Sequence, residues 1–302
     1  NLANLLRYGS DGVNPYPSPQ ANPVYPPLLP HLKIWLEYSN EIWSNGDSFP
    51  QGNWAAQQAA ALGLSKEQFN ARRFARIWQI FQHVLGGSER LVRVAAIWTA
   101  SSSYTTAFLT ELKNYGATLS PPVAPDVISP TTYFGNGIQD WAYEQANLAA
   151  GTPGQWFHTA ATFVENGVTK PVSVPLNDAY WTNALLRAQQ AATFREWKRR
   201  FFSGSTAAGG GPDATGMGGG FDASLRSTIQ TIFGRPVPIV AYEGGPSLYS
   251  DYYDGADSRD DGITHFLIAL NRLPEFAEIY RIHLNMAPVS YTHLTLPTIY
   301  SV

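Results

Sequence analysis

Two glutamates at the ends of apolar segments are the side chains in this sequence best suited to do chemistry. Glu41 closes the stretch LKIWLEYSNE, Glu243 closes VPIVAYE, and loop-type residues follow each. Carboxylates are costly to bury unless they are paired or reactive. Two of them at one site can divide a reaction, because the carboxyl with the raised pKa donates a proton while the ionised one attacks or stabilises a positive centre. Either glutamate alone could instead cap a helix or pair with an arginine.

The elements that must position these glutamates are short apolar segments alternating with helical ones. We expect strands at residues 33–39, 91–98, 125–134 and 237–242, one long helix over 53–85 and another over 221–233. Such alternation indicates α/β architecture with a parallel sheet covered on both faces. A (β/α)8 barrel and an open doubly wound sheet both fit this order, and in a barrel the chemistry sits at the carboxyl ends of the strands.

A third glutamate, Glu37, precedes Glu41 by four residues. If the strand continued through both, their side chains would point to the same face. Glu37 would then lie about 13 Å deeper, at roughly 3.3 Å per residue. We expect it to be a buried support in a hydrogen-bonded network rather than a reagent.

Composition excludes several classes of function. The 302-residue chain has a formal net charge of -3 and no basic stripe, which argues against nucleic-acid binding. No apolar run approaches the ~20 residues that span a bilayer. There are no cysteines, and the six histidines lack paired metal-ligand spacing. No G-x-S-x-G elbow and no Gly-rich phosphate turn follows an expected strand. We therefore expect no metal, no cofactor, no nucleic acid and no membrane partner.

Two short motifs resemble those of a known enzyme group. EYSNEIW is similar to the acid/base motif at the end of strand four in clan A glycoside hydrolases, which are retaining (β/α)8 enzymes, and IVAYEGG resembles their strand-seven motif. The resemblance covers roughly residues 33–285. It implies that Glu41 is the general acid/base, that Glu243 is the nucleophile, and that Asn40 hydrogen-bonds the sugar 2-hydroxyl.

The same resemblance suggests residues that bind substrate. Tyr133, at the end of strand six, would steady the nucleophile, and Trp98, at the end of strand five, would stack on a sugar face. Tyr8, at the start of the Pro-rich loop over residues 8–30, would line a subsite together with other tyrosines of that loop. Core packing is the alternative for Tyr133 and Trp98.

The implied domain is an incomplete TIM barrel over residues 1–288, with strands four to seven present and the first three and the eighth missing. Residues 203–220 are expected to be a flexible Gly-rich loop. The last segment, 289–302, contains VSYTHLTLPT, which resembles a sequencing-library adapter read in one frame, so we expect a non-native tail.

Taken together, the expectation is a bacterial, secreted or periplasmic, monomeric glycosidase that cleaves a β-linked poly- or oligosaccharide by double displacement. A fragment of it is expected to be inactive by itself. The main alternative is a non-catalytic carbohydrate-binding barrel derived from such an enzyme. An open α/β hydrolase-like enzyme is a weaker third option, because no convincing serine or aspartate nucleophile is present.

Overall fold

The computed structural model describes residues 1–134, 162–165, 168–171, 219–246 and 290–291. The chain divides into two compact units, one formed by residues 1–131 with 225–242 and the other by residues 132–224 with 243–302. Each unit is described by itself below.

A parallel sheet forms the centre of the first unit. Its strands β1 (Ile34–Leu36), β2 (Leu91–Ala96) and β3 (Val127–Ser129) pair in chain order. The segment around β7 (Val240–Ala241) continues this order, because a parallel bridge joins Ile128 to Ile239. Four parallel segments in chain order belong equally to a barrel or to an open sheet, so the closed barrel stays a prediction.

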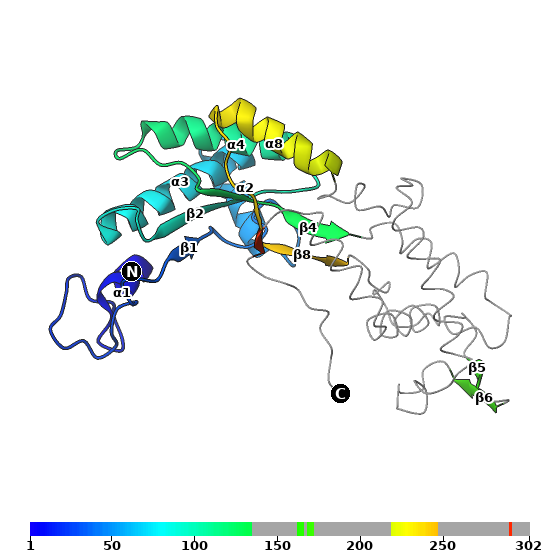
Figure 1. Ribbon diagram of the computed structural model, residues 1–302, viewed down its shortest axis with the longest axis horizontal. Helices are drawn as coiled ribbons and strands as arrows, with labels where there is room; N and C mark the ends of the chain where they lie inside the picture. The colour runs from blue at the N-terminus through cyan, green and yellow to red at the C-terminus, as the bar shows by residue number, and fades with distance from the viewer. Residues whose placement is uncertain (135–161, 166–167, 172–218, 247–289, 292–302) are drawn as a thin grey trace. The chain divides into compact units, whose positions relative to one another are not determined.

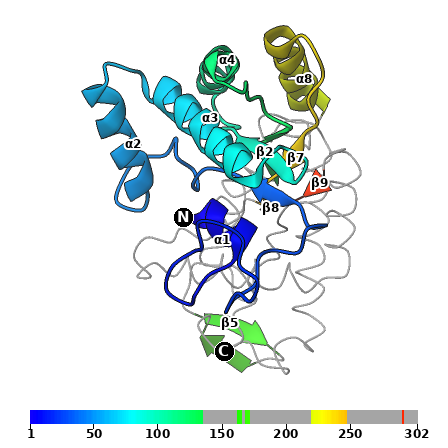
Figure 2. The same cartoon turned by 90° about the vertical axis from the view of Figure 1, so that its left-hand side faces the viewer.

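Helices cover one side of this sheet. Figures 1 and 2 show α3 (Lys66–Leu85), α4 (Ser102–Thr118) and α8 (Gly219–Phe233) on the same side of it. Between α3 and α4 the fully buried Phe74 ring meets Trp78 at 5.7 Å and Phe108 at 5.2 Å, both edge to face. Burying each such side chain contributes about 1.5–3 kcal/mol. The Trp78 indole also donates to the Leu36 carbonyl, which ties α3 to β1.

The prediction of one helix over 53–85 is wrong. The chain forms α2 (Pro50–Ala61), turns, and restarts as α3. Gly63 has a φ of 65°, in the left-handed region that interrupts a helix. Ser65 then begins α3 with a capping box, since its hydroxyl accepts from the Gln68 amide while the Gln68 side chain accepts from the Ser65 amide.

All four predicted strands are also shorter than expected. β1 ends at Leu36, and beyond it Ser39 and Glu41 have φ values of 61° and 42°. Strand alternation therefore does not reach Glu41, and the prediction that it puts Glu37 and Glu41 on one face is wrong. The segment predicted at 125–134 divides into β3 and β4 (Thr131–Phe134).

A short helix lies at the amino-terminal ends of β1 and β2. Ala3 of α1 (Leu2–Tyr8) packs with Ile34, Phe81 and Leu91, so α1 rests where α3 ends and the two strands begin (Figure 1). The Pro-rich loop that follows is ordered by backbone hydrogen bonds. In two of these, the Ser10 and Tyr25 amides each donate to the other residue's carbonyl at 3.0 Å.

Apart from the first residues of α8, the described parts of the second unit are short strands. β4 lies beside β8 (Glu243–Pro246) in a two-stranded sheet. β5 (Thr162–Glu165) and β6 (Val168–Pro171) form an antiparallel hairpin, and Ser290–Tyr291 form β9. Of the predicted Gly-rich loop, residues 203–218 lie outside the described residues, whereas 219 and 220 begin α8. All of the predicted tail except 290–291 also lies outside them.

Replacing Ser65 by alanine tests how much the restart of α3 depends on its cap. Ser65→Ala should lower the free energy of unfolding by about 1 kcal/mol, because the first turn of α3 loses its side-chain acceptor. Urea unfolding followed by tryptophan fluorescence measures this. Ser18→Ala, at an exposed loop position, is the matched control and should change stability little; equal losses in the two variants would contradict the capping role.

Candidate active site

The loop after β1, residues 37–46, contains Asn40 and Glu41 and is called the Asn-Glu loop below. Asn40 is exposed, and Glu41 is half-buried with its backbone in the left-handed region. That conformation costs a residue with a side chain about 1–3 kcal/mol and persists only when the surroundings impose it. The groups that hold this loop therefore determine where the Glu41 carboxyl lies.

Lys66, the first residue of α3, holds the second half of the loop. Its ammonium donates to the Trp43 carbonyl at 2.8 Å, the Ser44 carbonyl at 3.1 Å and the Asn45 side-chain oxygen at 2.6 Å. All three N–H groups of one lysine can thus be used on three consecutive residues. Burial lowers the pKa of Lys66.

The start of α2 holds the loop from another side. Gln51 donates to the Asn40 carbonyl at 2.8 Å, and the Asn53 side chain bonds both the amide and the carbonyl of Gly46. Between them, Gly52 approaches so closely that an added Cβ would lie 1.6 Å from the Ser44 carbonyl oxygen. A glycine is therefore required at this contact.

An aromatic cluster, formed by Trp43, Trp98, Tyr104 and Tyr242, gathers at the carboxyl ends of the strands. Trp43 follows β1, Trp98 follows β2 and Tyr242 follows β7. Tyr104 of α4 meets Trp98 at 5.9 Å and Trp43 at 6.4 Å, and Trp43 meets Tyr242 at 5.9 Å. Trp98 is 39% exposed, whereas the other three rings are buried. The cluster thus has a buried base and one ring open to solvent.

A buried amide supports this base. Asn70 of α3 has no exposed surface and donates to the Tyr104 hydroxyl at 2.7 Å and, at 3.5 Å, to the Ile42 carbonyl. Burial raises the pKa of Tyr104, so its hydroxyl stays protonated at any working pH. Asn70 therefore links the Asn-Glu loop to the aromatic cluster.

Glu37 lies at the start of the loop and differs from what the sequence suggested. It is half-buried, and burial raises its pKa to about 7. In the part of the chain that the structure describes, its carboxyl makes no hydrogen bond or ion pair, so the expected hydrogen-bonded network around it is not found there.

The other predicted site residues fall at separate places. Trp98 contacts the Tyr104 ring, and the same ring contacts Trp43, which follows Glu41 by two residues. Glu243 is half-buried, opens β8 of the second unit and directly follows Tyr242.

Two predicted substrate-binding tyrosines remain. Tyr133 belongs to β4, which pairs with β8, so the structure brings the strands of Tyr133 and Glu243 together. Tyr8 ends α1 at the opposite ends of the strands, and its neighbour Arg7 donates to the Val84 carbonyl there. The structure does not bring Tyr8 to the Asn-Glu loop.

Sequence reasoning missed the residues that hold the loop, which are Gln51, Asn53, Lys66 and Asn70. One signal could have indicated Lys66. A basic residue in the first turn of a helix opposes the helix dipole, so a lysine directly after a serine cap suggests another partner for its charge.

Comparisons with known proteins identify no family for this chain. No family model, no curated protein and no solved structure matches this chain. None of the helices in the described part has the length and apolar character needed to cross a bilayer. The described residues also contain no group of three or more His, Asp or Glu side chains that could hold a metal ion.

Removing the Lys66 ammonium should loosen the Asn-Glu loop. Lys66→Met should lower the free energy of unfolding by about 1–2 kcal/mol, because three oxygens lose a charged donor at a partly exposed site. Urea unfolding measures the loss. Lys33→Met is the matched control, since among the described residues that ammonium donates to the Glu89 carbonyl alone and should matter less; a loss as large as that of Lys66→Met would contradict the anchoring role.

The raised pKa of Glu37 makes stability depend on pH. In the unfolded chain this carboxyl ionises near pH 4.5, whereas in the folded chain it keeps its proton up to about pH 7. The folded state therefore binds more protons in this window and loses up to about 3 kcal/mol of stability as pH rises from 4.5 past 7.

Glu37→Gln should remove that dependence, so that the variant becomes more stable than the wild type at pH 8 but not at pH 4. Chemical denaturation at a series of pH values measures it. Glu89→Gln, at an exposed position, should keep the wild-type slope. An unchanged slope in Glu37→Gln would show that Glu37 is not the group responsible.

Proposed function

We propose that this chain carries the catalytic carboxylates of a retaining glycoside hydrolase that cleaves a β-linked poly- or oligosaccharide. The observation that supports this most is the Asn-Glu loop. Asn40 and Glu41 follow the carboxyl end of a parallel strand, and α2 and α3 clamp their loop beside a solvent-exposed tryptophan. The residue before Glu243 packs on Trp43 of that loop.

In the proposed reaction the two glutamates have separate roles. Glu41 protonates the glycosidic oxygen while the Glu243 carboxylate attacks the anomeric carbon, which gives a glycosyl ester and the free leaving alcohol. Glu41 then removes a proton from water, which attacks the same carbon and releases Glu243. Asn40 hydrogen-bonds the sugar 2-hydroxyl, and that bond strengthens as positive charge develops at the anomeric carbon.

Substrate recognition in this proposal depends on aromatic faces. The Trp98 ring is supported edge-on by buried Tyr104 and leaves 39% of its surface open, so it can stack on the C–H face of a sugar. Tyr133 is proposed to steady Glu243 from the neighbouring strand. A polymeric substrate also fits a secreted or periplasmic monomer, which is part of the same proposal.

A non-catalytic carbohydrate-binding barrel is the second candidate. The same exposed Trp98 favours it, because a stacking platform serves binding without hydrolysis. The two candidates differ in whether removing either glutamate changes a turnover rate, and the following experiment separates them.

Single substitutions of the two glutamates, in the full-length protein with activated aryl β-glycosides, test the reaction. Glu41→Ala should slow turnover by about 10²–10⁴-fold through loss of acid/base catalysis, and Glu243→Ala should abolish it. Azide should rescue both variants. It should give an α-glycosyl azide with Glu243→Ala, where it replaces the nucleophile, and a β-glycosyl azide with Glu41→Ala, where it replaces the water.

Glu89→Ala, an exposed glutamate outside the proposed site, is the control and should keep wild-type activity. Wild-type rates in Glu243→Ala, or azide products of the reversed stereochemistry, would end the assignment. A wild-type protein that binds oligosaccharide but hydrolyses none of the glycosides would favour the binding barrel.

A further inference from the structure

A pocket lies in the first unit, away from the Asn-Glu loop. It is bounded by the C-terminal half of α4, by the loop that leads into β3, and by the segment between α8 and β7. These are the amino-terminal ends of β3 and β7, whereas the Asn-Glu loop follows the carboxyl end of β1. The proposed glycosidase reaction therefore makes no use of it.

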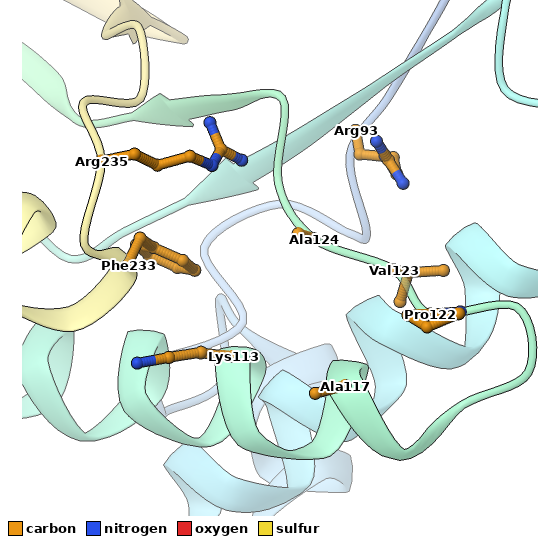
Figure 3. Close-up of a pocket in the computed structure, with 8 residues that line it drawn as sticks. All are labelled: Arg93, Lys113, Ala117, Pro122, Val123, Ala124, Phe233 and Arg235. Atoms are coloured by element: carbon orange, nitrogen blue, oxygen red, sulfur yellow. The ribbon is translucent and has the colours of Figure 1, made fainter.

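The pocket has a cationic side. Arg93, Lys113 and Arg235 all line it, and they come from β2, from α4 and from the segment after α8. Figure 3 shows Arg235 extending into the space beside Phe233, with Lys113 running along α4 below. The three cationic side chains thus come from separate elements and line the same pocket.

One carboxylate, that of Asp126, lies beside two of these three cations. Asp126 accepts from Arg93 Nε at 2.9 Å and Nη2 at 2.8 Å, a bidentate pair. Arg235 donates to the Pro125 and Pro236 carbonyls at 3.3 and 3.4 Å, and it also interacts electrostatically with Asp126, which it shares with Arg93. Within the described part of the chain, the Lys113 ammonium makes no hydrogen bond or ion pair. Two positive charges therefore remain for an anion.

The rest of the lining is apolar. The remaining residues that line the pocket are Ala117, Pro122, Val123, Ala124 and Phe233. The cavity measures about 400 Å³, a size typical of small-molecule sites and far larger than one inorganic anion requires. A ligand that fills it needs an apolar body as well as a charge.

We propose that this pocket binds a small organic anion, with a carboxylate or phosphate group on the cationic side that Lys113 and Arg235 provide and a flat apolar body against Phe233 and Val123. Arg235 is already fixed by the two backbone carbonyls, so little side-chain entropy is lost when it binds. Lys113 supplies the second charge from the rigid surface of α4. This proposal does not depend on the glycosidase proposal, and either one can be wrong without the other.

Calorimetric titration of the full-length protein tests this site. The probes are benzoate and phenyl phosphate, with neutral benzamide and inorganic phosphate as comparison ligands. Benzoate or phenyl phosphate should bind saturably, and the tighter of the two identifies the anionic group. Benzamide lacks the charge and inorganic phosphate lacks the apolar body, so each should bind about tenfold more weakly or not at all.

Single substitutions test whether the preferred probe binds in this pocket. Lys113→Met should weaken the preferred probe by about tenfold or more without lowering the melting temperature, because this ammonium has no partner among the described residues. Arg73→Met is the matched control, since it removes a cation that instead lies over the Tyr38 and Trp54 rings, and it should leave binding unchanged.

Three results would overturn the proposal. Equal affinity for benzamide would show an apolar crevice without charge recognition, and equal affinity for inorganic phosphate would show a merely basic surface. Binding of the preferred probe that survives Lys113→Met, or that falls equally in Arg73→Met, would place the anion elsewhere. None of these results bears on the glycosidase assignment, because the pocket lies at the ends of the strands opposite to the Asn-Glu loop.

Discussion

The parallel pairing of β1, β2 and β3 is the constraint on which the rest of the first unit depends. In a parallel sheet all carboxyl ends lie at one edge, so residues that are distant in sequence meet there. Trp43, Trp98 and Tyr242 each follow a different strand and pack into one cluster for this reason. The same constraint gathers Arg93, the loop before β3 and Arg235 toward the opposite ends. One pairing pattern thus creates two separate places where side chains from several elements converge.

The helices that cover the sheet also fix the loop that carries Asn40 and Glu41. α3 packs its aromatic residues against α4, and its first residue, Lys66, bonds three residues of the loop. α2 supplies Gln51 and Asn53 from the other side. A backbone conformation as unusual as that of Glu41 is sustained only by such contacts. Stability of the core and placement of the proposed acid/base residue are therefore coupled through α3.

Much of this architecture could be predicted from the sequence. Runs of apolar residues located the strands of the first unit, and their chain order matches the order in the sheet. The residues at which strands and helices begin and end could not be predicted as well. Nothing in LKIWLEYSNE marks the end of β1 at Leu36, because the residues after it leave the strand through backbone angles that loop contacts impose. Likewise Gly63 and Ser65 signal a break in the long helical segment, but the apolar periodicity on both sides conceals it.

The sequence singles out the two candidate glutamates, whose catalytic pairing stays a prediction, but it does not indicate the residues that hold the loop. Carboxylates at strand ends are conspicuous because burial makes them costly. The residues that hold the loop donate hydrogen bonds to backbone carbonyls, as Lys66, Asn70 and Gln51 do. Because every residue has a backbone carbonyl, these partners cannot be inferred from residue types. The raised pKa of Glu37 also depends on how much solvent reaches it, which only the folded chain decides.

We propose that Glu41 and Glu243 form one retaining pair, and a crystal structure of the protein with a bound sugar analogue would test this pairing. The quantity to measure is the separation of their two carboxyl groups. We expect about 5–5.5 Å, the distance that lets one carboxylate attack while the other protonates the leaving oxygen. A separation of about 6.5–9.5 Å would indicate inverting chemistry, and a larger one would contradict a shared catalytic site.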